Sequence, residues 1–259
     1  MEEKGTLRVI KDLTLRKASS NLALEESLAK HVDGGMSPPT VRFWRNSFSA
    51  IVGRSQRVSK EVDTGFCRTH GVEIVRRPSG GGSVIHHPEN LNYSIYLPSD
   101  RDHRNKELKT QLYVEPLLEA LNGSGLKARP SVNGIYVDEM KISGTAQSRR
   151  WGVLFHGTLL LRDHDIMSHM KELLLAHDGE YRGDDNYVSS DPSPVACVEE
   201  LIGPLFRVSG FFDSWIGLLG EALNLTPLNG CISQQEWGKA RELARDKYQA
   251  DRWNYRFKA

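Results

Sequence analysis

Cysteine is scarce in this chain, with three residues in 259 positions. Cys67, Cys197 and Cys231 show neither zinc-site spacing nor the density of a disulfide framework, so we expect reduced thiols in a cytoplasmic protein. All three lie outside the motifs described below, and we expect them to be buried structural thiols. Long hydrophobic runs are also missing: no apolar stretch approaches the ~20 residues of a membrane span, and residues 1–8 lack the apolar core of a signal peptide.

Neither sign of charge is in excess. Lysine and arginine together number 34, against 33 aspartates and glutamates, and the formal net charge is +1. No overall electrostatic field therefore favours nucleic acid as a partner. The apolar fraction of 39% is sufficient for a packed core at this chain length.

Glycine, by contrast, is concentrated in one informative segment, residues 76–86, which reads RRPSGGGSVIH. Glycine allows positive φ and lets backbone N–H groups approach a ligand closely, and successive exposed N–H groups form a concave anion site. Arg76 and Arg77 add two planar, permanently charged groups that suit carboxylate or phosphate. The segment predicts a cradle for a small acid or a phosphate.

The surroundings of the glycines indicate a loop between two strands. An apolar run at residues 72–75 precedes them, and the β-type segments 83–85 and 91–97 follow, with Pro88 marking a turn. A dinucleotide-binding loop would lead into a helix, and a Walker loop would end in Gly-Lys-Ser/Thr, so neither pattern fits. A flexible glycine-rich turn without a ligand remains the alternative from the glycines alone.

The rest of the chain mixes short helices and strands. Periodicity predicts helices over 19–32, 108–121, 166–176 and 211–223, a short helix within 57–70, and a last helix from Ser233 with a capping box. Pro116 either begins or bends its helix. Strands are predicted over 41–44, 50–53, 135–137, 141–144 and 153–161, with a hairpin turn at 138–140 and a polar loop over 182–194. We therefore expect an α+β fold with one main sheet, in one domain spanning residues 1–259.

A second motif lies about fifty residues after the glycines. Residues 133–147 read NGIYVDEMKISGTAQ, and residues 156–161 read HGTLLL. Lys141 stands on a predicted strand among apolar and small residues, where its ammonium would act as a point charge for phosphate or carboxylate. Gly144 and Ala146 leave room for a slender ligand. The alternative is an edge-strand lysine that extends into water.

Together the two motifs resemble the biotin/lipoate protein ligase superfamily, and within it the lipoate–protein ligases. The matching segments are residues 76–86, the Asn-Leu-Asn strand at 90–92, Lys141–Gln147 and His156–Leu160. The resemblance implies a central mixed or antiparallel β-sheet flanked by α-helices. It also implies that a carboxylic acid, lipoate or octanoate, reacts with ATP to give an acyl-adenylate and pyrophosphate. A lysine of a lipoyl-carrier protein then takes the acyl group as an amide.

The resemblance also implies roles for particular residues. Lys141 would stabilise the charge shared by the acyl carbonyl and the α-phosphate, the catalytic task in a reaction between two anions. The residues implied to bind substrate or adenylate are Arg77, Ser79, Gly80, Gly81, Gly82, Ser83, His86, Asn90, Asn133, Gly144, Ala146, Arg149 and His156. The expected Mg²⁺ would be held mainly by phosphates, and no protein ligands for a metal are identified.

The sequence departs from this family at identifiable points. Gly134 stands where many ligases have Asp, so the placement of the nucleotide or metal at this point is open. Residues 87–89 replace a commoner Asp-x-Gly. Many lipoate ligases continue into an accessory domain of about a hundred residues. We therefore expect this chain to act with a separate accessory subunit, or without one, and to adenylate poorly alone.

Three other functions were weighed against the ligase. An octanoyl or lipoyl transferase of the same fold would form a thioester on a cysteine, which in one branch precedes the lysine strand. Residues 128–132 read ARPSV and contain no cysteine, although a transferase that takes preformed lipoyl-adenylate would need none. A biotin ligase usually carries Gly-Arg-Gly-Arg, which is absent. A non-catalytic lipoyl-domain-binding protein would have little reason to keep both Lys141 and the glycine loop.

Overall fold

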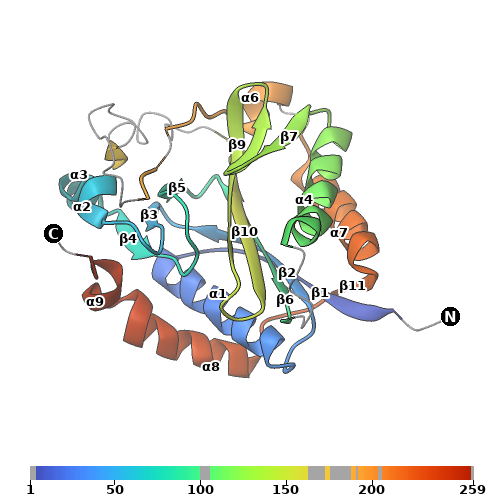
Figure 1. Ribbon diagram of the computed structural model, residues 1–259, viewed down its shortest axis with the longest axis horizontal. Helices are drawn as coiled ribbons and strands as arrows, with labels where there is room; N and C mark the ends of the chain where they lie inside the picture. The colour runs from blue at the N-terminus through green and yellow to red at the C-terminus, as the bar shows by residue number, and fades with distance from the viewer. Residues whose placement is uncertain are drawn as a thin grey trace.

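Two β-sheets form the framework of the molecule (Figure 1). The computed structural model describes residues 4–99, 106–162, 173–175, 188–190, 192–203 and 206–257. The strands are β1 (Gly5–Arg16), β2 (Thr40–Asn46), β3 (Ser49–Val52), β4 (Glu73–Arg76), β5 (Val84–His86), β6 (Leu91–Leu97), β7 (Ala128–Ser131), β8 (Gly134–Val137), β9 (Met140–Ser148), β10 (Val153–Leu159) and β11 (Leu225–Asn229). The helices are α1 (Ala18–Asp33), α2 (Val58–Glu61), α3 (Thr64–His70), α4 (Lys106–Gly123), α6 (Val198–Ile202), α7 (Val208–Leu223), α8 (Gln234–Leu243), the π-helix η3 (Ala244–Tyr248) and α9 (Asp251–Asn254).

The large sheet is mixed, as predicted. Its order is β11-β1-β2-β6-β10-β9-β8-β7. Strand β1 runs parallel to both β11 and β2, whereas the pairs from β2 through β6, β10, β9 and β8 to β7 are antiparallel. The antiparallel pairing places β10 between β6 and β9, near the centre of the sheet.

The two faces of this sheet differ in chemistry. On β2, Val41 and Phe43 point into an apolar core with α4 and α7, while Trp44 packs with Leu22 of α1 on the opposite face. Alternation with period two explains why neighbours in sequence face opposite ways. Figure 1 shows α4 and α7 together beside one face, and α1 with α8 beneath the other. The face toward α1 carries the site.

The small sheet has the order β4-β3-β5, with β4 parallel and β5 antiparallel to β3. The glycine-rich segment connects β4 to β5, which confirms the prediction of a strand-to-strand loop. Hydrogen bonds from His86 at the end of β5 to Asn46 of β2 and Thr158 of β10 tie the two sheets together. These bonds place the glycine loop over the α1 face of the large sheet.

Most predicted elements are confirmed, with several differences. The sequence prediction missed β1, β7 and β11, although Leu7, Val9, Leu13 and Leu15 follow the alternating pattern of a strand. Residues 57–70, expected to hold one short helix, hold two, α2 and α3, because Asp63 caps the second through the N–H groups of Gly65 and Phe66. Pro116 lies inside α4. Most of the predicted helix 166–176 and of the loop 182–194 lies outside the described residues.

The last predicted helix begins as expected. Ser233 accepts a hydrogen bond from the N–H of Glu236, and the Glu236 carboxylate accepts one from the N–H of Ser233, which is a capping box. Among the helices in the described part of the chain, none is long and apolar enough to cross a membrane.

Candidate active site

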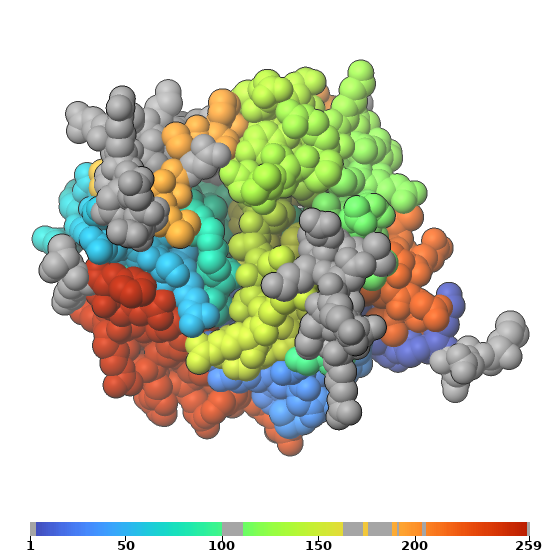
Figure 2. Space-filling view, viewed as in Figure 1, coloured from blue at the N-terminus to red at the C-terminus, as the bar shows by residue number. Residues whose placement is uncertain are grey.

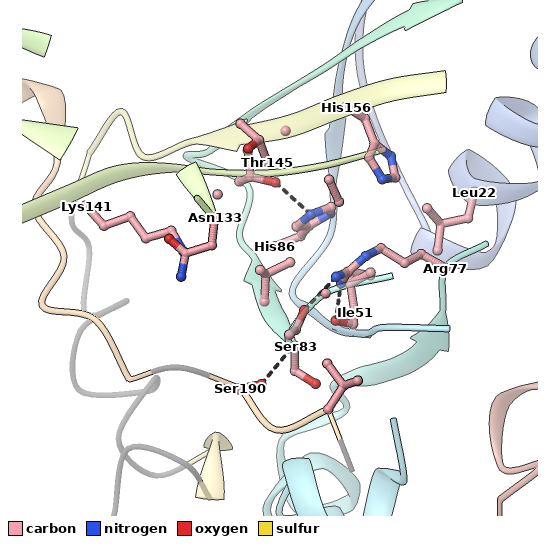
Figure 3. A pocket seen from close by; sticks show the side chains of 18 of the residues that line it. Leu22, Ile51, Arg77, Ser83, His86, Asn133, Lys141, Thr145, His156 and Ser190 are labelled. Carbon is pink, nitrogen blue, oxygen red and sulfur yellow. Dashed lines mark hydrogen bonds between the residues drawn. The ribbon is translucent and has the colours of Figure 1, made fainter. Parts of the chain in front are cut away.

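A cavity of about 250 Å³ lies between the glycine loop, α1 and the strands β9 and β10 (Figure 3). Its mouth appears in the space-filling view as a hollow between the residues that follow β3 and those of β9 and β10 (Figure 2). The residues predicted from sequence that line it are Arg77, Gly81, Gly82, Ser83, His86, Asn133, Lys141, Gly144, Ala146 and His156. The fold therefore brings both sequence motifs to one cavity.

Four predicted residues do not line the cavity. Ser79 is buried behind it, hydrogen-bonded to His156. Asn90 is buried in the turn between β5 and β6, with its side-chain N–H near the Ile85 carbonyl oxygen. Gly80 is exposed on the outer side of the loop, and Arg149 lies beyond the end of β9.

The prediction that both arginines offer their guanidinium groups to an anion is wrong for Arg76. Its side chain is fully buried and donates to the backbone carbonyls of Gly53, Gln56 and Asn254, at 2.6–2.8 Å. A buried cation needs hydrogen-bond acceptors, and here they are the chain's own peptide groups. Arg76 therefore anchors the C-terminal segment to the small sheet.

Arg77 borders the cavity, but its guanidinium also organises the loop. Nη2 donates to the carbonyls of Gly80 and Gly82, each at 2.6 Å, and Nε donates to Ser79 at 3.0 Å. Burial lowers the pKa of Arg77 to about 10, while the charges of Glu25 and Glu61 favour its protonated form. Arg77 thus stays charged at neutral pH and holds the glycine loop curled around it.

Close approach of backbones explains two of the glycines. A Cβ on Gly53 would collide with the carbonyl oxygen of Gly81, so the strand end and the loop touch directly. Gly81 itself has φ of 84°, in the region that favours glycine. A side chain at either position would move the loop out of the cavity wall.

Ser190 joins the glycine loop to a segment far along the chain. Its Oγ accepts hydrogen bonds from the N–H of Ser83 at 2.7 Å and from the Gln56 side chain at 3.3 Å. Since the oxygen accepts twice, its hydroxyl proton is directed to the buried carboxylate of Glu61. Residues 188–190 thereby form one wall of the cavity.

A hydrogen-bonded chain of three side chains begins in the cavity lining, at Glu25 and His156, and ends behind it at Ser79. The Glu25 carboxylate accepts from Nδ1 of His156 at 3.0 Å, and Nε2 of His156 accepts from the hydroxyl of Ser79 at 2.7 Å. This connectivity resembles that of a hydrolase triad. Ser79, however, does not line the cavity and already accepts from Arg77, so it orients His156 rather than attacking a substrate.

A second chain fixes the tautomer of His86. The Asn46 amide donates to Nδ1 at 2.9 Å, so Nε2 carries the proton and donates to Thr158 at 2.8 Å, and Thr158 donates to Asn92. Burial, and then the positive charge of Arg77, lowers the pKa of His86 to about 3. His86 is therefore a neutral, rigid part of the wall.

Lys141 projects from β9 toward Asn133 at the other end of the cavity (Figure 3). Its ammonium lies 6.0 Å from the ring centroid of Tyr136, whose hydroxyl donates to Asn133. A Cβ on Gly134 would collide with the Ser143 carbonyl and lie 2.8 Å from Cε of Lys141. In this chain, glycine in place of the family's Asp thus leaves room for the lysine side chain.

Sequence reasoning missed several residues of the site: Leu22, Glu25, Trp44, Ile51, Thr145, Thr158 and Ser190. Leu22 and Glu25 belong to a predicted helix, and α1 is buried on nearly all sides between the sheet and α8. Ser190 carried no local signal.

Metal ligands are not grouped at the site. Among the described residues no cluster of three or more His, Cys, Asp and Glu side chains could hold a metal ion. Of the residues that the structure describes, Glu25 is the one carboxylate lining the cavity, and it is already hydrogen-bonded to His156 and Ser94.

Comparison with known proteins identifies the class. Residues 17–217 match the family "Lipoyl protein ligase A/B catalytic domain". The chain therefore belongs to this family, as the two motifs predicted. The cavity that unites those motifs lies within the matched residues.

Curated relatives within the family fall into two kinds. The lipoate-protein ligase LplJ of Bacillus subtilis is 32% identical over 242 residues, covering 91% of this chain and 69% of LplJ. The octanoyltransferase LipM of Geobacillus kaustophilus is 28% identical, covering 91% of this chain and 93% of LipM. Because the chain is similar to both kinds of enzyme, these relatives alone do not identify its acyl donor.

Solved structures agree on the fold. A bipartite lipoate protein ligase, solved with its E2 lipoyl domain from Thermoplasma acidophilum, matches 100% of this chain and 98% of that chain, with a TM-score of 0.79 and 26% identity. A lipoate-protein ligase A bound with ATP matches 98% of this chain and 99% of that chain, with a TM-score of 0.80 and 26% identity. The predicted fold class is confirmed.

Proposed function

We propose that this chain activates lipoate or octanoate with ATP and transfers the acyl group to a lysine of a lipoyl-carrier protein. The observation that carries the proposal is the joining of Lys141, the glycine loop and a partly apolar interior in one cavity. Such a cavity suits a slender acid whose carboxylate must meet a second anion. The relative solved with ATP and the ligase relatives support the same reaction.

In the first step, a carboxylate oxygen attacks the α-phosphorus of ATP. The bond from that phosphorus to the bridging β-phosphate oxygen breaks, and pyrophosphate leaves with the bonding electrons. We assign to Lys141 the stabilisation of negative charge as carboxylate and phosphate approach. Arg77 acts indirectly, because it holds the glycine loop around the acid, and the neutral His86 keeps its part of the wall uncharged.

In the second step, the acceptor amine attacks the acyl carbonyl, AMP leaves, and the nitrogen releases its proton to solvent. The adenylate is already activated, so alignment of the amine supplies most of the remaining rate. Mg²⁺ would be held mainly by the nucleotide phosphates.

The position of the cysteines favours a ligase over a thioester-forming transferase. None of the three lines the cavity, and Cys67 and Cys197 are fully buried, at 2% and 0% exposure. Burial raises the pKa of Cys67 to about 11, which disfavours the nucleophilic thiolate. Cys231 is exposed rather than buried, which corrects the sequence prediction for that residue.

A donor test distinguishes the two reactions. An unmodified lipoyl domain is incubated with the chain and either octanoate plus ATP, or octanoyl thioester on an acyl carrier protein without ATP. We expect modification, measured by a mass increase of the domain, with the first donor. Modification from the thioester alone would make this chain a transferase.

Two relatives from Thermoplasma acidophilum support the expectation of a second polypeptide as an accessory subunit. One is named as subunit 1 of a lipoate-protein ligase, and the other belongs to a bipartite ligase. We infer that this chain also works with an accessory subunit. Adding such a subunit should raise the rate of adenylation, and an unchanged rate would remove it from the account.

A further inference from the structure

Outside the cavity, cationic and aromatic side chains from three parts of the chain stack into one surface. It comprises Arg54, Arg150, Trp151, Lys247, Trp253 and Arg256, here called the basic rim. Lys247 lies 4.0 Å from the Trp253 ring centroid and 5.4 Å from that of Trp151. The guanidinium carbon of Arg256 lies 4.6 Å from the same Trp253 centroid. The rings and cations therefore hold one another in place.

The basic rim adjoins the mouth of the cavity. The N–H of Arg54 donates to the Ser79 carbonyl at the base of the glycine loop, and Arg150 follows the end of β9, whose middle lines the cavity. Arg256 reaches back to the carbonyl of Arg54. Figure 2 shows the segment after β3, the β9–β10 turn and the C-terminal segment meeting at one edge of the hollow.

The positive charge of the basic rim is not neutralised within the described residues. Glu26 binds Lys247 at 2.5 Å but also Lys30 at 2.7 Å, so one carboxylate serves two ammonium groups. Within that same part of the chain, no carboxylate forms an ion pair with Arg54, Arg150 or Arg256, and the buried Nε of Arg256 has no hydrogen-bond acceptor. Burial and then the charges of Arg54 and Arg150 lower the pKa of Arg256.

We propose that the basic rim docks an acidic face of the lipoyl-carrier acceptor, so that its lysine enters the cavity beside Lys141. The inference rests on the proposed function and adds where the acceptor binds. Arginine and tryptophan are enriched at the energetic centres of protein interfaces, and an unneutralised patch selects a partner of opposite charge. The surface lies outside the cavity lining, which favours a protein over the nucleotide's phosphates as its occupant.

The test separates docking from activation. Arg54→Glu, Arg150→Glu and the double variant are compared with Arg207→Glu, which makes the same charge change at an exposed position on the N-terminal side of α7. Transfer to a lipoyl domain that the wild-type chain modifies is measured with chemically made lipoyl-adenylate. Lipoate-dependent exchange between ATP and pyrophosphate is measured separately, and thermal melting confirms folding. The substitutions change side chains only, so the backbone carbonyl of Arg54, which accepts from Arg76 and Arg256, stays in place.

We expect KM for the lipoyl domain to rise about tenfold in each single variant and further in the double variant, with exchange unchanged. High salt should raise the wild-type KM and affect the double variant less. An unchanged KM for the lipoyl domain would overturn the proposal. A raised KM for ATP would overturn it in favour of a phosphate site. Absence of exchange in the wild type would count against the proposed function, while transfer from lipoyl-adenylate would still report on docking.

Discussion

The two faces of the large sheet are built from the same strands but hold different chemistry. Toward α4 and α7 the central strands present Val41, Phe43, Tyr93, Ile95 and Phe155, which form an apolar core. Toward α1 the alternating neighbours are Arg42, Trp44, Asn92, Ser94 and His156, mostly polar and nevertheless buried. One face contributes stability through area removed from water, and the other holds hydrogen-bonded groups around a cavity.

This difference indicates how the fold divides its tasks. Buried polar groups are costly unless they find partners, and the α1 face supplies most of these partners through long chains of hydrogen bonds, although Nε and Nη1 of Arg42 and Nδ2 of Asn92 have none among the described residues. One such chain runs from Arg42 through Asn21 and Asn46 to His86. Substitutions on the apolar face should therefore change stability, and substitutions at the cavity should change catalysis.

Phe43→Ala provides the largest expected effect on stability. The ring is fully buried, with centroid distances of 4.3 Å to Phe212 and 5.3 Å to Trp215. We expect the free energy of unfolding to fall by about 3–5 kcal/mol, measured by denaturant titration, with the exchange rate per folded molecule retained. Leu228→Ala, at a half-exposed position, is the control and should change stability little. A specific loss of exchange in folded Phe43→Ala would break the division between the faces.

Lys141→Ala should have the opposite effect, with activity lost and stability retained. We expect the rate of adenylate formation to fall by roughly 10²–10³-fold, because a charge at the reacting centre is lost. The unfolding free energy should stay close to that of the wild type, since the side chain is only partly buried. Lys127→Ala removes an exposed lysine and serves as the matched control. Equal rates in the two variants, measured by AMP release, would remove Lys141 from its role.

Thr158→Val tests the hydrogen-bonded chain itself. The substitution keeps the shape but leaves Nε2–H of His86 and Oδ1 of Asn92 without their partner. We expect a loss of about 1–3 kcal/mol in unfolding free energy. Thr158→Ser retains the hydroxyl and should recover most of that loss. If Thr158→Val keeps the wild-type stability, the hydrogen bonds of the Thr158 hydroxyl do not contribute to stability.

The smallest expected effect, taken per pH unit, is the change in unfolding free energy caused by protonation of His86. The pKa of His86 in the folded protein is about 3, below the ordinary value of 6.5, so between these pH values the unfolded chain binds a proton that the folded chain does not. Stability from this group is full above pH 6.5 and is lost as pH falls from 6.5 toward 3, by at most about 1.4 kcal/mol per pH unit. Between pH 6.5 and 4.5, His86→Gln should show a shallower decline than the wild type in urea titrations. Parallel declines would contradict a neutral, buried His86.

Local pattern was enough to predict the central strands and much of the cavity. Alternating apolar residues identified β2, β6 and β10, and the two motifs identified Lys141, the glycine loop and His156. The partners of the polar face were not predictable, because they come from distant parts of the chain. Ser190 is 107 positions from Ser83, and Glu25 is 131 positions from His156. Arg76 was misassigned for the same reason, since its acceptors lie up to 178 positions away.

Exchange of labelled pyrophosphate into ATP, dependent on added lipoate or octanoate, tests the central claim most directly. The purified wild-type chain, with an accessory subunit where one is available, is compared with Lys141→Ala. The account predicts acid-dependent exchange in the wild type and its loss in the variant. Absence of exchange in the wild type, together with transfer of octanoyl groups from a thioester donor, would contradict the claim that the cavity forms an acyl-adenylate.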